Sequence, residues 1–308
     1  MGEPIRVKLN LALVGVAAFL HLLQLILLPL CLVPHNALWL LLLVPCALSS
    51  NFLWYLAHEG FHQNLHPVPR LNATLGHVLA VAFGAPFHVL RFGHLMHHRF
   101  NGAPVDRPDL FDPGRESRRR ASIRYYFNLC GGFYLQEVLS AWVFLLPRSL
   151  IRTLAAALLR QADAETVEIG RLALDVLLRP KVVRSCRVDA ACTWALVMIG
   201  VWAYSGYAYM LILSVLARAF LVSVANNLPH YGTPPHDRLY GMNFSLPWPL
   251  DIMLLHFNCH RIHHHQPLLP WNLLPSAMQA AGDRFDITCR QALFQQFRGP
   301  LSMSAFKD

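Results

Sequence analysis

Three short histidine-rich blocks are the residues of this chain whose types and spacing could do chemistry. Box one is HEGFH at 58–62, box two is HLMHH at 94–98 and box three is HRIHH at 260–264. On a helix, residues i, i+3 and i+4 share one side, so we expect each HxxHH block to point three imidazoles at one spot. Imidazole binds iron, zinc, copper or nickel, and eight such ligands are more than one tetrahedral zinc takes. The pattern predicts a two-metal site held almost wholly by histidine.

Chance does not account for this pattern. Histidine is 17 of 308 residues, and random placement at that frequency gives HxxHH about 0.05 times in such a chain. The sequence contains it twice.

The composition is that of a membrane protein. Hydrophobic residues make up 55% of the chain and charged residues 14%, a balance too apolar for a soluble domain. The seven cysteines form no CxxC pair, which argues against a disulfide framework and against a cysteine zinc site. The net charge is +9, but no nucleic-acid-binding motif accompanies it, so we expect no nucleic-acid partner.

Four apolar stretches are expected to cross the bilayer as helices. Trp54 and Tyr55 are expected at the membrane interface, and Asp189 is expected to start the third helix. The apolar segment 75–90 is short and contains Gly84 and Pro86, so it is expected to be re-entrant or interfacial. The predicted spans are about 9–33, 37–57, 190–204 and 207–225.

We predict a helical cap on one side of the membrane, formed by the remaining residues, 58–188 and 226–308. It includes an amphipathic helix over 150–178. The two opposite turns, 34–36 and 205–206, have no Lys or Arg. By the positive-inside rule the cap, the boxes and both termini are cytoplasmic. The expected fold is therefore an all-α integral membrane protein, with residues 1–308 as a single domain of four transmembrane helices and a cytoplasmic helical cap that carries the histidine-rich site.

The chemistry expected of such a site is oxidation. Two adjacent metal ions can reduce O2 to a species that abstracts hydrogen from an unactivated C–H bond, and zinc is excluded because it is not redox-active. An imidazole-rich shell in a reducing compartment favours iron. The expected cofactors are two iron ions, with O2 as co-substrate, and the apolar spans offer a dry slot for an alkyl chain.

The three boxes resemble those of the membrane fatty acid desaturase/hydroxylase superfamily, over roughly residues 37–275. Its pattern is HxxxH or HxxxxH followed by two HxxHH blocks, with a ninth histidine upstream of the last block. His230 in NLPHYG fits the ninth position. The metal ligands implied by this resemblance are His58, His62, His94, His97, His98, His230, His260, His263 and His264.

The acyl desaturase branch of this superfamily adds one more residue. There an asparagine four residues before the ninth histidine joins the metal sphere through water, and Asn226 stands at that position. The resemblance implies O2-dependent removal of two hydrogens from an acyl chain, with no catalytic residue beyond the metal ligands. Two electrons would come from a separate donor of the ferredoxin or cytochrome b5 type, because no such domain is fused to this sequence.

Other functions remain open on the sequence. A hydroxylase or ketolase of the same superfamily, acting on an alkyl, acyl or carotenoid substrate, would use the same ligands. HEGFH also matches the HExxH signature of a zinc metalloprotease, with Glu59 as general base, but that interpretation leaves both HxxHH boxes unused. A metal transporter would place its ligands within the spans.

Several residues near the boxes are candidates for a supporting role. Glu59 is expected to hydrogen-bond a ligand imidazole. His265 together with His260 would be an alternative ligand choice in box three to the i, i+3, i+4 set. His66 lies four residues after His62 but precedes Pro67, which indicates that the helix has ended. The other neighbours are His256, one turn before His260, and three acids expected to cap turns, Asp106, Asp109 and Asp112.

Overall fold

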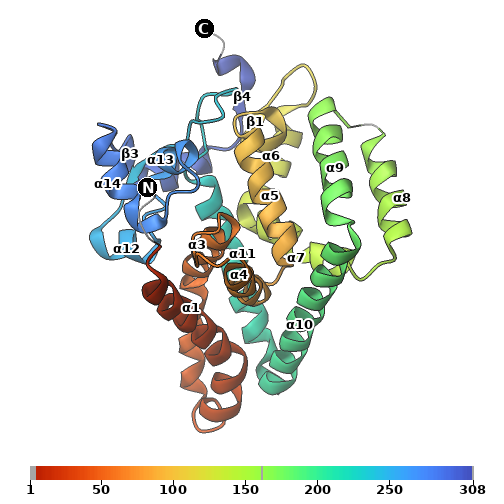
Figure 1. The fold of residues 1–308 in the computed structure, drawn as a ribbon, viewed down its shortest axis with the longest axis vertical. Coiled ribbons are helices and arrows are strands. Elements are labelled where there is room, and N and C mark those ends of the chain that lie inside the picture. Colours follow the sequence, from red (N-terminus) through yellow and green to blue (C-terminus); the bar gives the residue numbers. More distant parts are fainter. Residues whose placement is uncertain (1–4, 161, 307–308) are drawn as a thin grey trace.

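The computed structural model describes residues 5–160 and 162–306, which are mostly helical. Three helical segments are long and apolar enough to cross a membrane, Val7–Leu32, Ala37–Phe61 and Pro180–Asn227, or up to four if a bent pair of helices counts as one broken span. In Figure 1 these segments converge in the lower half of the molecule, below the histidine-bearing helices α5 (Phe87–Phe100) and α13 (His260–His265).

The first two segments form a helical hairpin (Figure 1). Helix α1 (Val7–Leu22) continues into the wider-wound η1 (Leu23–Leu32), which contains Pro29, a residue that cannot donate a backbone hydrogen bond. After the turn, η2 (Ala37–Leu42), α2 (Leu43–Leu48) and α3 (Ser50–Phe61) return toward α5. The helical segments expected at 9–33 and 37–57 are thus present, and the second runs on into box one.

The third segment folds back on itself. Helix α10 (Pro180–Tyr204) and helix α11 (Ala208–Asn227) are joined by η5 (Ser205–Tyr207), where Ser205 takes a φ of 47°. A straight helix of this length would extend about 72 Å, more than twice the hydrocarbon thickness of a bilayer. The prediction that Asp189 starts the third helix is wrong, because α10 begins nine residues earlier.

Asp189 instead fixes the bent pair α4 (Pro69–Phe83) and α5, whose axes differ by 95°. Gly84, with a φ of 109°, ends α4, and Pro86 precedes α5. The buried Asp189 carboxylate accepts hydrogen bonds from the Phe87 backbone nitrogen (3.0 Å) and from His77 Nδ1 (2.8 Å). This contact sets the direction in which α5 leaves the bend, and α5 carries box two.

The other helices include one difference from the sequence expectation. The single amphipathic helix expected over 150–178 is two antiparallel helices, α8 (Arg148–Leu159) and α9 (Ala164–Leu177), because Asp163 caps a new helix start by accepting from the Thr166 nitrogen at 2.8 Å. The remaining helices are η3 (Pro104–Asp106), α6 (Arg118–Phe127), η4 (Asn128–Gly132), α7 (Phe133–Val143), α12 (Trp248–Met253), η6 (Trp271–Leu273), α14 (Leu274–Ala280), α15 (Cys289–Gln295), η7 (Gln296–Arg298) and η8 (Met303–Phe306).

Two short parallel strand pairs join loops that are distant in the sequence. Strand β1 (Leu110–Phe111) pairs with β4 (Leu301–Ser302), and β2 (Phe244–Ser245) pairs with β3 (Ile287–Thr288). The first pair attaches the loop after box two to the C-terminal part of the chain. The second attaches the loop before box three to the same part.

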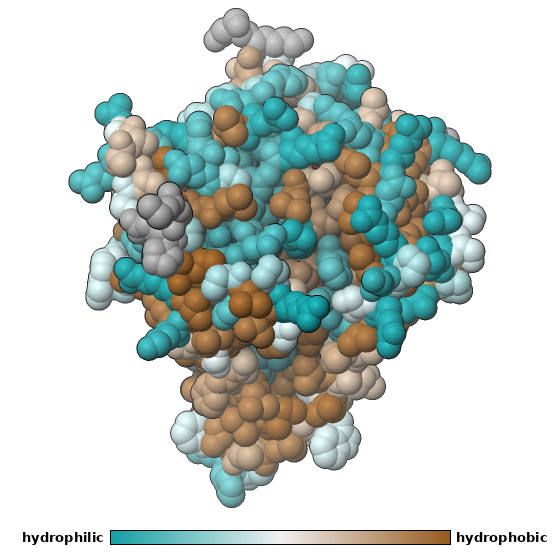
Figure 2. Space-filling view, in the orientation of Figure 1, coloured by the Kyte–Doolittle hydropathy of each residue, from teal (hydrophilic) through white to brown (hydrophobic). Residues whose placement is uncertain are grey.

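The largest apolar core lies around α3, α4 and the start of α5, next to the boxes. Trp54 and Tyr55 belong to this core, with 8% and 3% of their surface exposed, so they pack inside the protein and do not form a lipid-facing aromatic belt. Outside the core, exposed apolar side chains gather on the lower half of the molecule, and the upper half is mainly hydrophilic (Figure 2).

Candidate metal centre

The nine histidines of the predicted ligand set come together in two groups. Within each group, one ring nitrogen per residue lies within 4.8 Å of all the others. Group one consists of His58, His62, His94, His98 and His263, and group two of His97, His230, His260 and His264. These residues come from the end of α3, from α5, from the loop after α11 and from α13.

In group one the Nε2 atoms converge. His263 Nε2 lies 3.0 Å from His58 Nε2 and 3.0 Å from His98 Nε2. His94 Nε2 lies 2.9 Å from His98 Nε2 and 2.6 Å from His62 Nε2. Five imidazoles from three separate segments thus face one point.

Group two has the same construction. His260 Nε2 lies 2.9 Å from His230 Nε2 and 3.0 Å from His264 Nε2. The ring of His97 completes the group, with its centroid 4.5 Å from that of His230. The two groups adjoin, since the ring centroids of His98 and His264 are 4.6 Å apart.

Each HxxHH box is divided between the groups, which corrects the expectation that its three imidazoles share one spot. The residues four apart stay together: His94 and His98 in group one, and His260 and His264 in group two. The middle histidine of each box, His97 or His263, joins the other group. Neighbouring helical residues point about 100° apart, so each box reaches both groups.

Burial favours the neutral form of His62, His260 and His263. It lowers the pKa of His62 to about 3, with a smaller contribution from the positive charge of Arg91. Burial, followed by the neighbouring imidazoles, also lowers the pKa of His260 and His263 well below the ordinary value. Metal ions bind the deprotonated ring, so the folded chain presents these three imidazoles in the binding form.

The metal-free protein is therefore expected to lose stability in acid. The pKa of His62 is about 3 in the folded protein and 6.5 in the unfolded chain, so between these values only the unfolded chain takes up the proton. The free energy of unfolding is highest above pH 6.5 and falls as the pH drops toward 3. Thermal melting of chelator-treated protein at pH 8, 7, 6 and 5 checks this. A melting temperature that does not change over this range contradicts it, and His62→Gln should reduce the slope.

The donor set fits transition-metal ions. An ion about 2.1 Å from two imidazoles at right angles separates their nitrogens by about 3.0 Å, and a tetrahedral angle would need about 3.4 Å. Five of the six Nε2 separations given above are 2.9 or 3.0 Å. This spacing, and the five ligands of group one, suit a five- or six-coordinate ion better than tetrahedral zinc.

A carboxylate orients one of the rings. Asp106 Oδ2 accepts a hydrogen bond from His97 Nδ1 at 2.8 Å, which leaves Nε2 free to bind a metal ion. The prediction that Asp106 only caps a turn is therefore wrong. Asp109 is also misassigned, since it forms a buried ion pair with Arg107. Asp112 does cap a turn, by accepting from the Gly114 nitrogen at 2.9 Å.

Comparison with known proteins agrees with this geometry. The sequence model of the fatty acid desaturase family matches residues 34–290. The chain belongs to this family. No curated protein and no solved structure matches it significantly. Family membership makes the protein a desaturase-superfamily oxidoreductase, and its apolar helices are long enough to cross a membrane.

The other predicted neighbours differ in their relation to this desaturase-family centre. Glu59 lies beside His58, with its Oε1 3.5 Å from Nδ1, and its Oε2 accepts from the Trp271 nitrogen at 3.1 Å. Glu59 therefore faces Nδ1 of His58, on the side of the ring away from the converging Nε2 atoms. This position does not favour the protease interpretation, in which Glu59 would be the general base. The three histidines among these neighbours lie outside both groups: His66 accepts from the Val68 nitrogen, His256 stacks on Trp271, and His265 is exposed.

A cavity of about 190 Å³, called the chamber below, reaches both groups. It touches His94 of group one and His97 and His230 of group two. Its other walls include Trp54, Gly93, Phe133, Asp106, Asn226 and Glu137. Asn226, expected near the metal sphere, therefore faces the same space as three of the histidines.

Sequence reasoning missed Glu137 as a residue of this site. The side chain lies on α7, within residues 58–188, the predicted helical cap, and burial raises its pKa to about 7. One signal was available: an acid among apolar residues of a helix requires a polar surrounding. Only the packing of α7 beside α5 shows that this surrounding is the chamber.

Proposed function

We propose that the protein is a fatty acyl desaturase that holds two iron ions, one in each histidine group, and uses O2 as co-substrate. The single observation that carries the proposal is that each HxxHH box contributes to both groups. This keeps two ions adjacent, as a joint two-electron reaction with O2 requires. When bound, the iron ions would supply the oxidising chemistry that removes hydrogen from an unactivated C–H bond.

The rest of the site has simpler tasks in this proposal. The chamber would hold the reacting segment of the acyl chain, with Trp54 and Phe133 as its apolar walls. Asn226 would reach the metal sphere through water, and Asp106 would keep His97 in the metal-binding tautomer. The surrounding apolar core excludes bulk water from the reacting carbons.

The proposal also places the protein in its membrane. Val7–Leu32 and Ala37–Phe61 would each cross once and α10 and α11 once each, giving four spans with both termini and the centre on the cytoplasmic side. The two turns on the far side, 34–36 and 205–206, contain no Lys or Arg. Electrons would come from a separate soluble donor of the ferredoxin or cytochrome b5 type.

Metal content and lipid products test this function together. Protein purified in detergent from iron-replete cells is expected to carry about two iron ions per chain by elemental analysis. Lipids of the expressing cells should gain a double bond that is absent from cells expressing His97→Ala. A new hydroxyl or keto group in place of the double bond would identify the hydroxylase or ketolase alternative. One zinc, no iron and unchanged lipids would reject the proposal.

A further inference from the structure

His230 differs from His97 in what holds its ring. The Nδ1 of His97 is bonded to Asp106, whereas the Nδ1 of His230 is buried and has no hydrogen-bond partner among the described residues. No second-sphere group therefore orients the His230 ring through this nitrogen. Its position depends on the backbone of the loop that follows α11.

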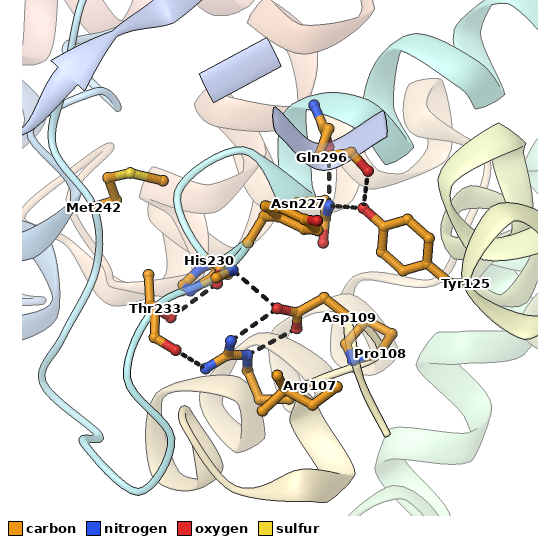
Figure 3. Close-up of polar contacts among 12 residues, drawn as sticks. Arg107, Pro108, Asp109, Tyr125, Asn227, His230, Thr233, Met242 and Gln296 are labelled. Carbon is orange, nitrogen blue, oxygen red and sulfur yellow. Dashed lines mark hydrogen bonds and ion pairs between the residues drawn. The ribbon is translucent and has the colours of Figure 1, made fainter. Parts of the chain in front are cut away.

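That loop is fixed on both sides of His230. Before it, Asn227 Nδ2 donates to Tyr125 Oη at 3.1 Å and to Gln296 Oε1 at 2.9 Å, which holds the end of α11. After it, the Thr233 hydroxyl donates to the His230 carbonyl oxygen at 2.8 Å. Figure 3 shows His230 between these two anchors.

The second anchor is completed by a buried ion pair from another loop. Arg107 and Asp109, between α5 and α6, have side chains only 1% exposed and form two hydrogen bonds with each other, both 2.8 Å long. Arg107 Nη1 also donates to the Thr233 carbonyl oxygen at 2.9 Å, and Asp109 Oδ2 accepts from the Gly232 nitrogen at 3.0 Å. The pair therefore holds Gly232 and Thr233, and its contact with Thr233 can be followed in Figure 3.

Stability alone does not explain such a pair. Burying two charges costs desolvation, and well-packed apolar residues of similar volume are often as stable or more so. What the pair supplies, and an apolar pair would not, is directed bonds to two backbone groups of the His230 loop.

We propose that Arg107 and Asp109 are positioning residues, which set the place of His230 and thereby retain the metal ion of group two. The inference rests on the proposed function only in that both groups bind metal, and not on any lipid reaction. It predicts that a substitution in the Arg107–Asp109 pair lowers the affinity for one of the two metal ions.

Cobalt(II) titration of the full-length, metal-free protein in detergent tests this, because bound cobalt absorbs visible light according to its ligands. The wild type should bind two ions. Asp109→Asn should bind the first ion normally and the second about 10- to 100-fold more weakly, the usual cost of losing an outer partner. Asp112→Asn, at a partly exposed acid three residues away that contacts neither the His230 loop nor Arg107, is the matched control and should titrate like the wild type.

A double variant separates positioning from general damage to the fold. In a His230→Ala background, adding Asp109→Asn should lower the affinity for the second ion by less than about twofold. The reason is that His230, the residue through which Asp109 acts, is already gone. Equal weakening in both backgrounds, equal loss of both ions, or no loss in Asp109→Asn would overturn the assignment. If Asp109→Asn does not fold, Arg107→Lys is the second variant, because it keeps the charge but not the forked geometry. It should bind the second ion more weakly than the wild type does. A titration curve identical to that of the wild type would overturn the proposal.

Failure of this inference is distinguishable from failure of the proposed function. Two tight ions in the wild type and in Asp109→Asn would reject the positioning role alone. Fewer than two ions in the wild type would reject the two-metal function itself, and the positioning role with it.

Discussion

Replacing His263 with alanine is expected to remove metal from group one and to lower product formation more than about a hundredfold, since losing even an outer partner of a metal site costs 10- to 100-fold. His263 Nε2 lies 3.0 Å from the Nε2 atoms of His58 and His98, so its loss opens the middle of the group. His263 is buried, with 2% of its surface exposed. Among the described residues, group one contains no sixth histidine that could take its place. Metal per chain and lipid product, measured on the same preparation, check this.

The control for this variant is two residues away. His265 is exposed and belongs to neither group, so His265→Ala should keep wild-type metal content and activity. It removes one imidazole from the same short helix and matches the His263 change in size. Full metal content and activity in His263→Ala would show that the converging histidines are not ligands.

Replacing Gly93 with leucine is expected to abolish product formation while both metal ions remain. Gly93 lies in the wall of the chamber, and a Cβ atom built there would meet Glu137 Oε1 at 4.0 Å, an ordinary contact, with nothing closer. The helix can therefore accept a side chain without moving box two, but the longer branches of leucine extend into the chamber. Product should fall more than tenfold, with metal content unchanged by elemental analysis.

Gly93→Ala is the matched control. Its methyl group fits the available space, and alanine favours a helix over glycine by about 1 kcal/mol, so this variant should keep metal and most activity and melt slightly higher. If Gly93→Leu retains wild-type activity, the substrate does not occupy the chamber. If it loses metal as well, the change has displaced His94 or His97 and a shorter side chain such as valine is needed to separate the effects.

Much of the centre could be predicted from the sequence because its geometry is local. A helix places residues three and four apart on one side whatever surrounds it, so HLMHH and HRIHH each had to present a cluster of imidazoles. The apolar segments had to be helical for a similar reason, since a chain in lipid must satisfy its own backbone. The apolar helical segments and the clustering of histidines within each HxxHH box follow from these two constraints, whereas His230 was implied only by the family resemblance.

Local geometry did not determine how the histidines are shared. The side chains of His97 and His98 diverge by about 100° around α5, and only the arrangement of α3, α5 and α13 decides which partners each of them meets. The same holds for Asp189, which reads as a helix start but ties α10 to the bend between α4 and α5.

The sequence by itself determined the kind of site: neutral nitrogen ligands, redox chemistry and a membrane setting. The tertiary structure alone decided its division into two groups, the chamber with Glu137 and the Arg107–Asp109 pair that holds the His230 loop. The physical reason is sequence separation, because Arg107 and Thr233 are 126 residues apart. Contacts of that kind depend on the packing of whole helices, which no local pattern encodes.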